Sequence, residues 1–314
     1  MRVFFILGLV LLPFAAAAQT EDSDRGFIQG LLEDALSAPG RSVRLTGFAG
    51  ALSSRATIEE ITVTDPDGVW FTATDVALSW NRGALLRGAI QIDEISVSEI
   101  TLPRRPLPAE SETPSPEASA AFALPDLPVS VDIAEMRIDK AVLGATVIGA
   151  AAEISFEGSA QLAGGAGQAT LAIERLDQPG RFDLEGAYDN ATRELALTLD
   201  LQEPENGLAV TLLGLPGQPS MELTVTGEDP ISDFEATVHM ATDGQDRLSG
   251  TVTLLSDDAG TNSFALDLGG DIAPVFVPEF AEFLGDAVAL EARGARTSDG
   301  ALSLDDLRLQ AAAL

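Results

Sequence analysis

The residues of this chain that could carry out chemistry are few, and their spacing does not suit it. The sequence has no cysteine and a single histidine, His239, which excludes thiol nucleophiles, thiolate zinc sites, iron–sulfur clusters and two-histidine metal sites. His239 could serve a Ser-His-Asp triad, but no G-x-S-x-G nucleophile turn accompanies it. It alternates with Val238 and Met240, so we interpret it as a solvated histidine on the polar face of a strand.

Three other motifs are also better explained by structure than by chemistry. The glycine run at 164–167 lacks the Lys-Ser/Thr of a phosphate loop and separates two predicted strands, so we interpret it as a turn. The segment 257–262 lacks the alternating ligands and final Glu of a calcium loop, which favours a hairpin loop. Acidic pairs such as Glu59-Glu60 point to opposite faces of a strand and do not converge on one atom. We therefore predict that the chain has no catalytic residue, no metal site and no cofactor, and that the protein is not an enzyme.

The charge of the chain excludes nucleic acid as its main partner. The 314 residues carry 18 Lys+Arg against 49 Asp+Glu, a formal net charge of −31. A chain this acidic repels a polyanion and has few cations to displace phosphate counterions. Its hydrophobic content of 46% is also too high for a disordered acidic chain. The chain has enough apolar material for a large core, and its length is typical of one long repetitive domain or two compact ones.

The N-terminus has the features of an export signal. Arg2 is followed by an apolar stretch from Val3 to Phe14 and by the small residues 15–18. The apolar stretch is short for a span of about 20 residues, so we predict either a signal peptide cleaved after Ala18 or an uncleaved signal anchor. A buried N-terminal helix is the weaker alternative. The mature chain is then exported and at most tethered by its first residues.

The elements that follow are predicted to be mostly β-strands. Apolar residues alternate with acidic residues and threonine, and turn signals recur every ten to fifteen residues, which predicts a meander with one apolar and one polar face. Helices are expected only near 22–36, 81–87 and 274–284. Residues 103–128 hold 7 of the 17 prolines and predict a linker. The expected inward, apolar residues are Leu195, Leu197, Leu199, Met221, Leu223, Val225, Val238, Leu266 and Leu268.

One short pattern occurs five times in the predicted strands. Apolar residues stand at i, i+3 and i+5 and an acidic residue at i+2, beginning at Ile58, Ile92, Val97, Ile133 and Leu304. A β-bulge before i+3 would keep all three apolar side chains on one face. A turn between two short strands is the alternative, which we disfavour because no Gly, Pro or Asn interrupts any copy.

Residues 41–106 contain a more specific motif, made up of Gly47, Phe48, Gly50, Ala51, Leu52, Gly68, Trp70, Trp80, Leu85, Leu86 and Gly88. With these residues the segment resembles the N-terminal region of the TamB family, the translocation and assembly module proteins of Gram-negative bacteria. The resemblance implies a mainly β fold, in which a long twisted antiparallel sheet curls into an open groove with a few short helices. It also implies a periplasmic protein held at the inner membrane by its N-terminus, with membrane phospholipids as cargo.

The export signal, the proline-rich linker and the resemblance together divide the chain into four expected segments. These are a signal peptide or anchor at 1–18, a helix with a TamB-like β segment at 19–102, the linker at 103–128, and a repetitive β groove segment at 129–314. TamB works with TamA, an outer-membrane barrel, through a C-terminal region that we expect to be missing here, since relatives are several times longer. Our first hypothesis is a phospholipid conduit, our second an outer-membrane protein or autotransporter assembly factor, and a distant third an adhesin-like structural protein.

Overall fold

The computed structural model describes most of the chain after its first 28 residues. The described residues are 29–30, 32–38, 40–50, 53–107, 123–125, 127–256, 262–276, 285, 287–296 and 302–311. The predicted export signal therefore lies outside the described residues, as do Ala51 and Leu52. Within the described residues, no helix combines the length and the apolar composition that a membrane span requires.

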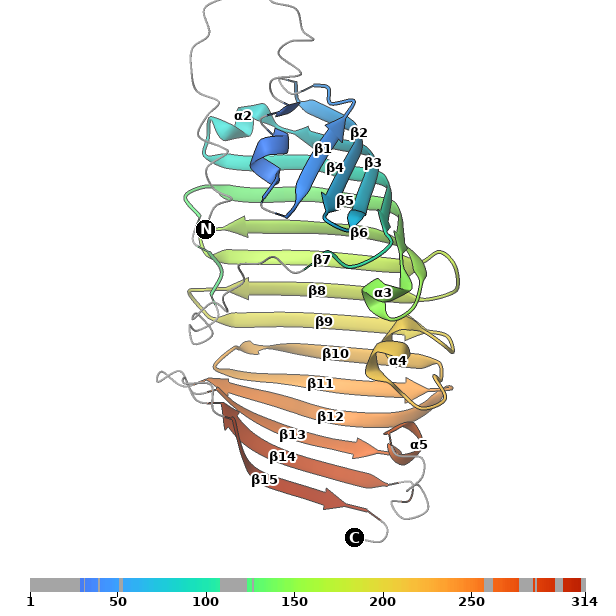
Figure 1. The fold of residues 1–314 in the computed structure, drawn as a ribbon. Helices are drawn as coiled ribbons and strands as arrows, with labels where there is room; N and C mark the ends of the chain where they lie inside the picture. Colours follow the sequence, from blue (N-terminus) through green and yellow to red (C-terminus); the bar gives the residue numbers. More distant parts are fainter. Residues whose placement is uncertain are drawn as a thin grey trace, which may run out of the picture.

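The fold is a single open sheet of fifteen strands (Figure 1). Every strand pairs with its neighbours in sequence. The strands are β1 (Ser42–Thr46), β2 (Arg55–Asp65), β3 (Gly68–Trp80), β4 (Ala89–Leu102), β5 (Ser130–Leu143), β6 (Ala152–Ala163), β7 (Ala166–Arg175), β8 (Arg181–Asp189), β9 (Glu194–Glu203), β10 (Met221–Pro230), β11 (Asp233–Thr242), β12 (Gln245–Ser256), β13 (Asn262–Gly270), β14 (Val288–Arg296) and β15 (Leu302–Gln310). The predicted β-meander is confirmed.

Local turn chemistry explains much of this meander. Gly164 and Gly165 join β6 to β7, and Asp243 and Gly244 join β11 to β12, all four with positive φ. Two consecutive residues of positive φ form the type I′ turn, whose twist matches that of the strands on either side. These tight turns place consecutive strands side by side in antiparallel pairs.

The pair β4–β5 departs from the predicted antiparallel arrangement, because it is parallel. A parallel pair needs a connection that returns along the whole strand length, which a tight turn cannot supply. The proline-rich segment between Leu102 and Ser130 supplies that connection. The composition of the predicted linker at 103–128, most of which lies outside the described residues, carried no information on the direction in which the chain re-enters the sheet.

Short helices lie at the ends of the strands. They are α2 (Arg82–Leu85), α3 (Ala145–Ile148), α4 (Leu208–Leu213) and α5 (Ala273–Phe276), and residues 29–30 and 32–36 are also helical. The helices predicted near 22–36, 81–87 and 274–284 are present in their described parts, whereas α3 and α4 were not predicted. The strand ends that carry α3, α4 and α5 all lie on one side of the sheet, which we call the helix side, and the opposite strand ends form the turn side (Figure 1).

Helix α4 went unpredicted because its N-terminal cap comes from another element. The residue before the helix is Gly207, which makes no side-chain cap. Instead, the carboxylate of Glu203, at the end of β9, accepts hydrogen bonds from the Leu208 and Ala209 amides at 3.0 and 2.7 Å. Free amides at a helix start need such an acceptor, and here the fold supplies it.

The predicted bulges are confirmed in three of the five repeat copies. The pairing register shifts across Asp93 in β4, between Ile133 and Met136 in β5, and across Asp305 in β15. In the copies that begin at Ile58 and Val97, the pairing is interrupted without a shift of register. For those two copies the predicted bulge is wrong, since the strands on both sides skip the same number of residues.

Candidate functional site

The apolar residues of consecutive strands stand opposite one another through the whole sheet. From β7 onward one row runs Leu171, Leu184, Leu199, Val225, Val238, Gly250, Leu268, Leu290 and Leu309, each residue paired with the next. In β4 and β5 the parallel pairing matches Ile92 with Ile133 and Ile95 with Met136. Because directly paired residues point to the same side of a sheet, these residues define one continuous surface, which we call the apolar face.

All nine residues predicted to point inward lie on the apolar face. Leu199 pairs with Val225, Val225 with Val238, and Val252 with Leu266, and the remaining members follow by alternation along β9, β10 and β13. Their surroundings differ. Met221 is only 1% exposed, whereas the other eight are half-buried.

Met221 is buried because α4 and α5 cover the helix side of the apolar face. Val210 of α4 is fully buried and packs with Met221, Met240 and Val275 in one cluster. The strand ends at β9–β11 therefore have an ordinary packed core. Toward the turn side, Leu195 and Leu197 of β9 are half-buried, whereas Phe234 and Ala236 of β11 are buried.

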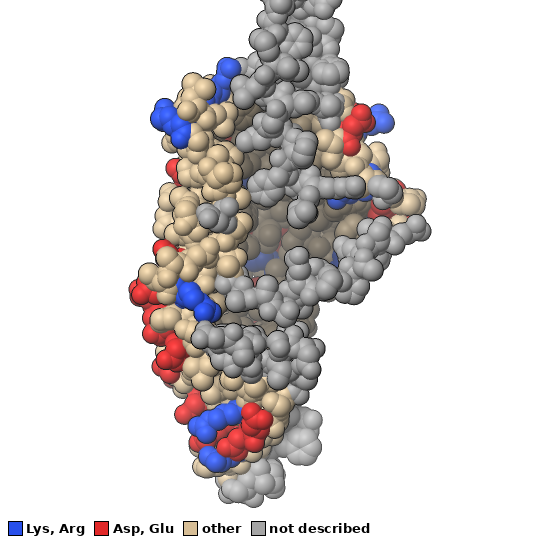
Figure 2. Space-filling model, turned by 90° about the vertical axis from the view of Figure 1, so that its left-hand side faces the viewer, with Lys and Arg blue, Asp and Glu red and all other residues tan. Residues whose placement is uncertain are grey.

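Figure 2, which looks along the strands, shows a hollow whose described wall is mostly uncharged, with a few charged atoms inside it, while acidic atoms gather on the outer edge of the sheet. Large exposed apolar patches on a soluble protein mark sites of interaction. The last strand continues the pattern, because Leu304 and Leu307 of β15 are each 58% exposed.

Glycine residues make the middle of the apolar face uneven. Leu197 stands between two of them, Gly186 in β8 and Gly227 in β10. The aromatic ring of Phe234 covers Gly227, since a Cβ added there would lie 2.7 Å from the ring. By contrast, a Cβ added at Gly186 would meet nothing within 4 Å. The apolar face therefore has open space above Gly186.

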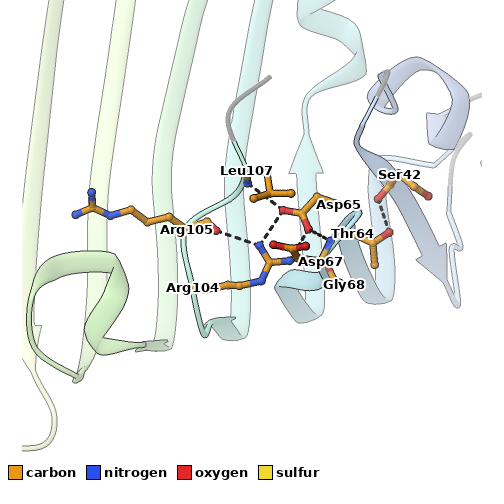
Figure 3. Close-up of polar contacts among 8 residues, drawn as sticks. All are labelled: Ser42, Thr64, Asp65, Asp67, Gly68, Arg104, Arg105 and Leu107. Carbon is orange, nitrogen blue, oxygen red and sulfur yellow. Dashed lines mark hydrogen bonds and ion pairs between the residues drawn. The ribbon is translucent and has the colours of Figure 1, made fainter. Parts of the chain in front are cut away.

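Ion pairs between Arg and Asp stabilise the helix side. Arg104, just after β4, donates to Asp65 at the end of β2 at 2.8 Å, and the Leu107 amide donates to the same carboxylate at 3.0 Å (Figure 3). The hydrogen bond from Arg104 holds the pKa of Asp65 well below its usual range; burial opposes this shift, and the amides of Leu107 and Asp67 add to it. The start of the β4–β5 connection is thereby tied to the β2–β3 turn.

A second such pair is formed by Arg175 and Asp177 at the end of β7. Arg175 shares the apolar face with Ile154, its partner in β6, and donates two hydrogen bonds to Asp177 at 2.8 and 2.7 Å. The hydrogen bond from Arg175 lowers the pKa of Asp177, against the effect of burial. Arg247 and Asp271 form a third pair, between β12 and the segment after β13. Each pair neutralises a cation at the border of the apolar face.

The other end of the β4–β5 connection lies on the apolar face at the turn side. Leu124 donates its amide to the Asn190 side chain and accepts from it, both at 2.8 Å. Its side chain reaches over Gly167, because a Cβ added to Gly167 would lie 2.8 Å from Leu124 Cδ1. Gly167 is paired with Leu162 and Tyr188 on this face.

The residues of the TamB-like resemblance have structural roles where they are described. Gly50 has φ +76, and a Cβ there would lie 2.1 Å from the Arg55 carbonyl oxygen. Phe48 is buried, and Trp70 packs against the cluster of Val43, Leu45 and Val63. Gly47, Gly68 and Gly88 also have positive φ, and Trp80 pairs with Ile92 across a bulge. Leu85 and Leu86 of the α2 turn are exposed.

No arrangement for catalysis emerges among the described residues. His239 lies 3.1 Å from Asp246 on the polar face, and both side chains are exposed. The described part of the chain contains no group of three or more side chains able to hold a metal ion. A hollow of about 450 Å³ lies at the turn side of β6–β9. Its lining includes Tyr188, Asp189, Glu194 and Glu228, and no Lys, Arg or His is among its lining residues. What the arrangement offers is an extended surface for an apolar molecule.

Comparison with known proteins gives one result of nearly full length. Residues 23–313 match the model of a family described as YdbH-like, intermembrane phospholipid transport protein YdbH. No curated protein and no solved structure matches the chain.

Proposed function

The chain belongs to the YdbH-like family of intermembrane phospholipid transport proteins, and from this premise we propose that it conducts phospholipids between the inner and outer membranes along its apolar face. In this proposal, acyl chains lie against the apolar face, which acts as an open groove, and headgroups stay in water at its mouth. The protein works in the periplasm and is associated with the inner membrane through its N-terminus. It acts by binding and needs no catalytic residue.

The observation that carries this proposal is the row of apolar residues across β7 to β15, which is interrupted by a glycine only at Gly250. A sheet that served only as a scaffold would cover this face with a second layer, because exposed apolar surface costs about 25 cal/mol per Å². Among the described residues, α4 and α5 cover the face near the helix side, and Leu124 covers Gly167 at the turn side. The leucines of β9 and β13 are only half-buried in the middle of the sheet.

The energetics of acyl chains suit such a surface. Each CH₂ group that leaves water gains about 0.8 kcal/mol, so a surface of Leu, Val and Ala is sufficient to hold a lipid chain. The gain is similar at every row, because the rows repeat the same residue types from strand to strand. A lipid can then move along the sheet without a deep trap at any one site.

The resemblance to TamB is limited to residues 41–106, and the partnership with TamA that it implies is not part of this proposal. The matched family describes phospholipid transport and provides no support for a TamA-like barrel as partner. We therefore place lipid conduction ahead of outer-membrane protein assembly, for which no described feature speaks specifically.

Photocrosslinking at matched positions on the two faces tests the proposal. A photoreactive residue at Leu197 or Leu223 on the apolar face should capture phospholipid. The same residue at Glu222 or Glu235, which are exposed on the polar face, should capture little. Equal labelling of the two faces, or no labelling of either, would remove the conduit proposal.

A further inference from the structure

The α2 turn between β3 and β4 exposes two adjacent leucines. Leu86 is 90% exposed and Leu85 is 49% exposed. Single exposed leucines are common on protein surfaces, but these two stand side by side at the tip of a turn. They belong to the segment 84–88, and the proposed lipid path along β7–β15 makes no use of them.

The exposure of these leucines is built into the turn. Asn81 Oδ1 accepts from the Gly83 amide at 3.0 Å, and Asn81 Nδ2 donates to Gln91 at 3.0 Å. Ala84, in the same turn, is buried at 1% exposure. The Gly88 carbonyl accepts a hydrogen bond from the Ser130 amide. The turn is thus fixed to β4 and β5 while it presents its leucines to the solvent.

Arginines bracket the two leucines. Arg82 and Arg87 are both exposed and lie within the same turn, in a chain that has only 18 cations against 49 anions. In Figure 2, Lys and Arg atoms are prominent at the upper end of the molecule, the end at which Figure 1 places α2, whereas acidic atoms dominate the outer edge lower down. Apolar tips flanked by cations bind the interface of anionic bilayers.

We propose that α2 docks this end of the sheet on the surface of an anionic phospholipid bilayer, with Leu85 and Leu86 inserted among the acyl chains and Arg82 and Arg87 at the phosphates. The turn lies beside the first strands, so docking brings the β1 end of the sheet against a membrane. Long arginine side chains can reach headgroups while neighbouring leucines enter the apolar layer. This docking does not depend on lipid conduction along the apolar face.

The structure contains a matched control in α4. Leu212 and Leu213 are also adjacent and are 63% and 61% exposed, but no Arg or Lys lies within that turn. If exposed leucines alone were sufficient for insertion, the two turns would behave alike. If the bracketing arginines matter, only α2 inserts.

Because the chain has no cysteine, a single reporter can be placed at each tip. Leu86→Cys and Leu213→Cys, made in the full chain and labelled with an environment-sensitive fluorophore, are mixed with vesicles of phosphatidylcholine, or with vesicles in which about a third of the lipid is phosphatidylglycerol. The reporter at 86 should move into an apolar environment on the anionic vesicles, and the reporter at 213 should stay in water. Arg87→Ala should weaken the response at 86 about fivefold.

Each result decides the proposal. A reporter at 86 that remains in water, an equal response at 86 and 213, or an equal response on neutral and anionic vesicles would overturn it. The reporter reads its own position, so binding through the N-terminal apolar segment does not imitate the expected result. Photocrosslinking at Leu197 in Leu86→Glu separates this proposal from lipid conduction, since lipid already held on the apolar face is captured whether or not α2 docks.

Discussion

Asn190 holds Leu124 on the apolar face through both ends of its side-chain amide. The oxygen accepts from the Leu124 amide and the nitrogen donates to the Leu124 carbonyl, each at 2.8 Å. Asn190 belongs to the turn between β8 and β9, and Leu124 to the connection between β4 and β5. A side chain of the protein itself thus occupies part of the surface that we propose for lipid, over Gly167.

Replacing Asn190 with alanine should release this end of the connection. The change removes two hydrogen bonds, each of which contributes about 1 kcal/mol net. We expect the Leu124 amide to exchange its hydrogen at least several-fold faster, with little change elsewhere in the sheet. Thr192→Ala, which lies in the same turn and removes a hydroxyl that accepts from the Glu194 amide, is the control. An unchanged exchange rate at Leu124 in Asn190→Ala would show that the contact does not hold the segment in solution.

Gly186→Val should raise stability and lower lipid binding at the same time. The added side chain meets open space, and valine suits a strand better than glycine by about 1 kcal/mol. The valine side chain also fills the open space above Gly186, beside Leu197, and so leaves less room there for an acyl chain. Urea unfolding and the amount of phospholipid that copurifies with the chain measure the two effects.

Gly227→Val is the matched control for Gly186→Val. Its Cβ would lie 2.6 Å from the Glu235 carbonyl oxygen and 2.7 Å from the Phe234 ring, so it should lower stability by about 1–3 kcal/mol. If Gly186→Val retained the full lipid content of the parent, the space above Gly186 would not belong to the lipid path.

Leu197→Asp should block lipid passage. The charge would stand in the middle of the apolar face, between Gly186 and Gly227, where burial against an acyl chain leaves it without a partner. Thr198→Asp places the same charge on the adjacent, exposed polar position and should have little effect. Transfer of labelled phospholipid between donor and acceptor vesicles compares the two. Equal transfer by both variants would contradict conduction along this face.

The Asp65–Arg104 pair should make stability depend on pH in the acid range. The pKa of Asp65 is lowered in the folded protein, so its contribution is fully present above the ordinary carboxyl pKa of about 4 and is lost as the pH falls toward the folded value. Between about pH 5 and about pH 3, the urea concentration at the unfolding midpoint should fall less in Asp65→Asn than in the parent protein. Part of the difference should persist, because the pKa values of Asp177 and Asp183 are lowered as well.

Asp67→Asn serves as the control for this pair. Asp67 lies in the same turn, and its backbone amide, not its carboxylate, bonds to Asp65. It should keep the pH dependence of the parent. If Asp65→Asn kept that dependence too, the ion pair would contribute nothing measurable to folding.

The sequence by itself determined which residues share a face of the sheet. Side chains alternate along a strand, so the spacing of Leu195, Leu197 and Leu199 is sufficient to place them together. The same local logic located the bulges at Asp93 and Asp305, where an extra residue stands between apolar positions. These features depend on neighbours within a few residues, which the sequence displays directly.

Only the tertiary structure decided what covers that face and where. The parallel return of β5, the Glu203 cap that starts α4, the burial of Met221 beneath Val210, and the contact between Asn190 and Leu124 all join residues from different elements. A local pattern cannot specify such pairs, because each depends on how strands far apart in the chain come to lie side by side. The residues of the apolar face were therefore predictable from their spacing, whereas its packed and open parts were not.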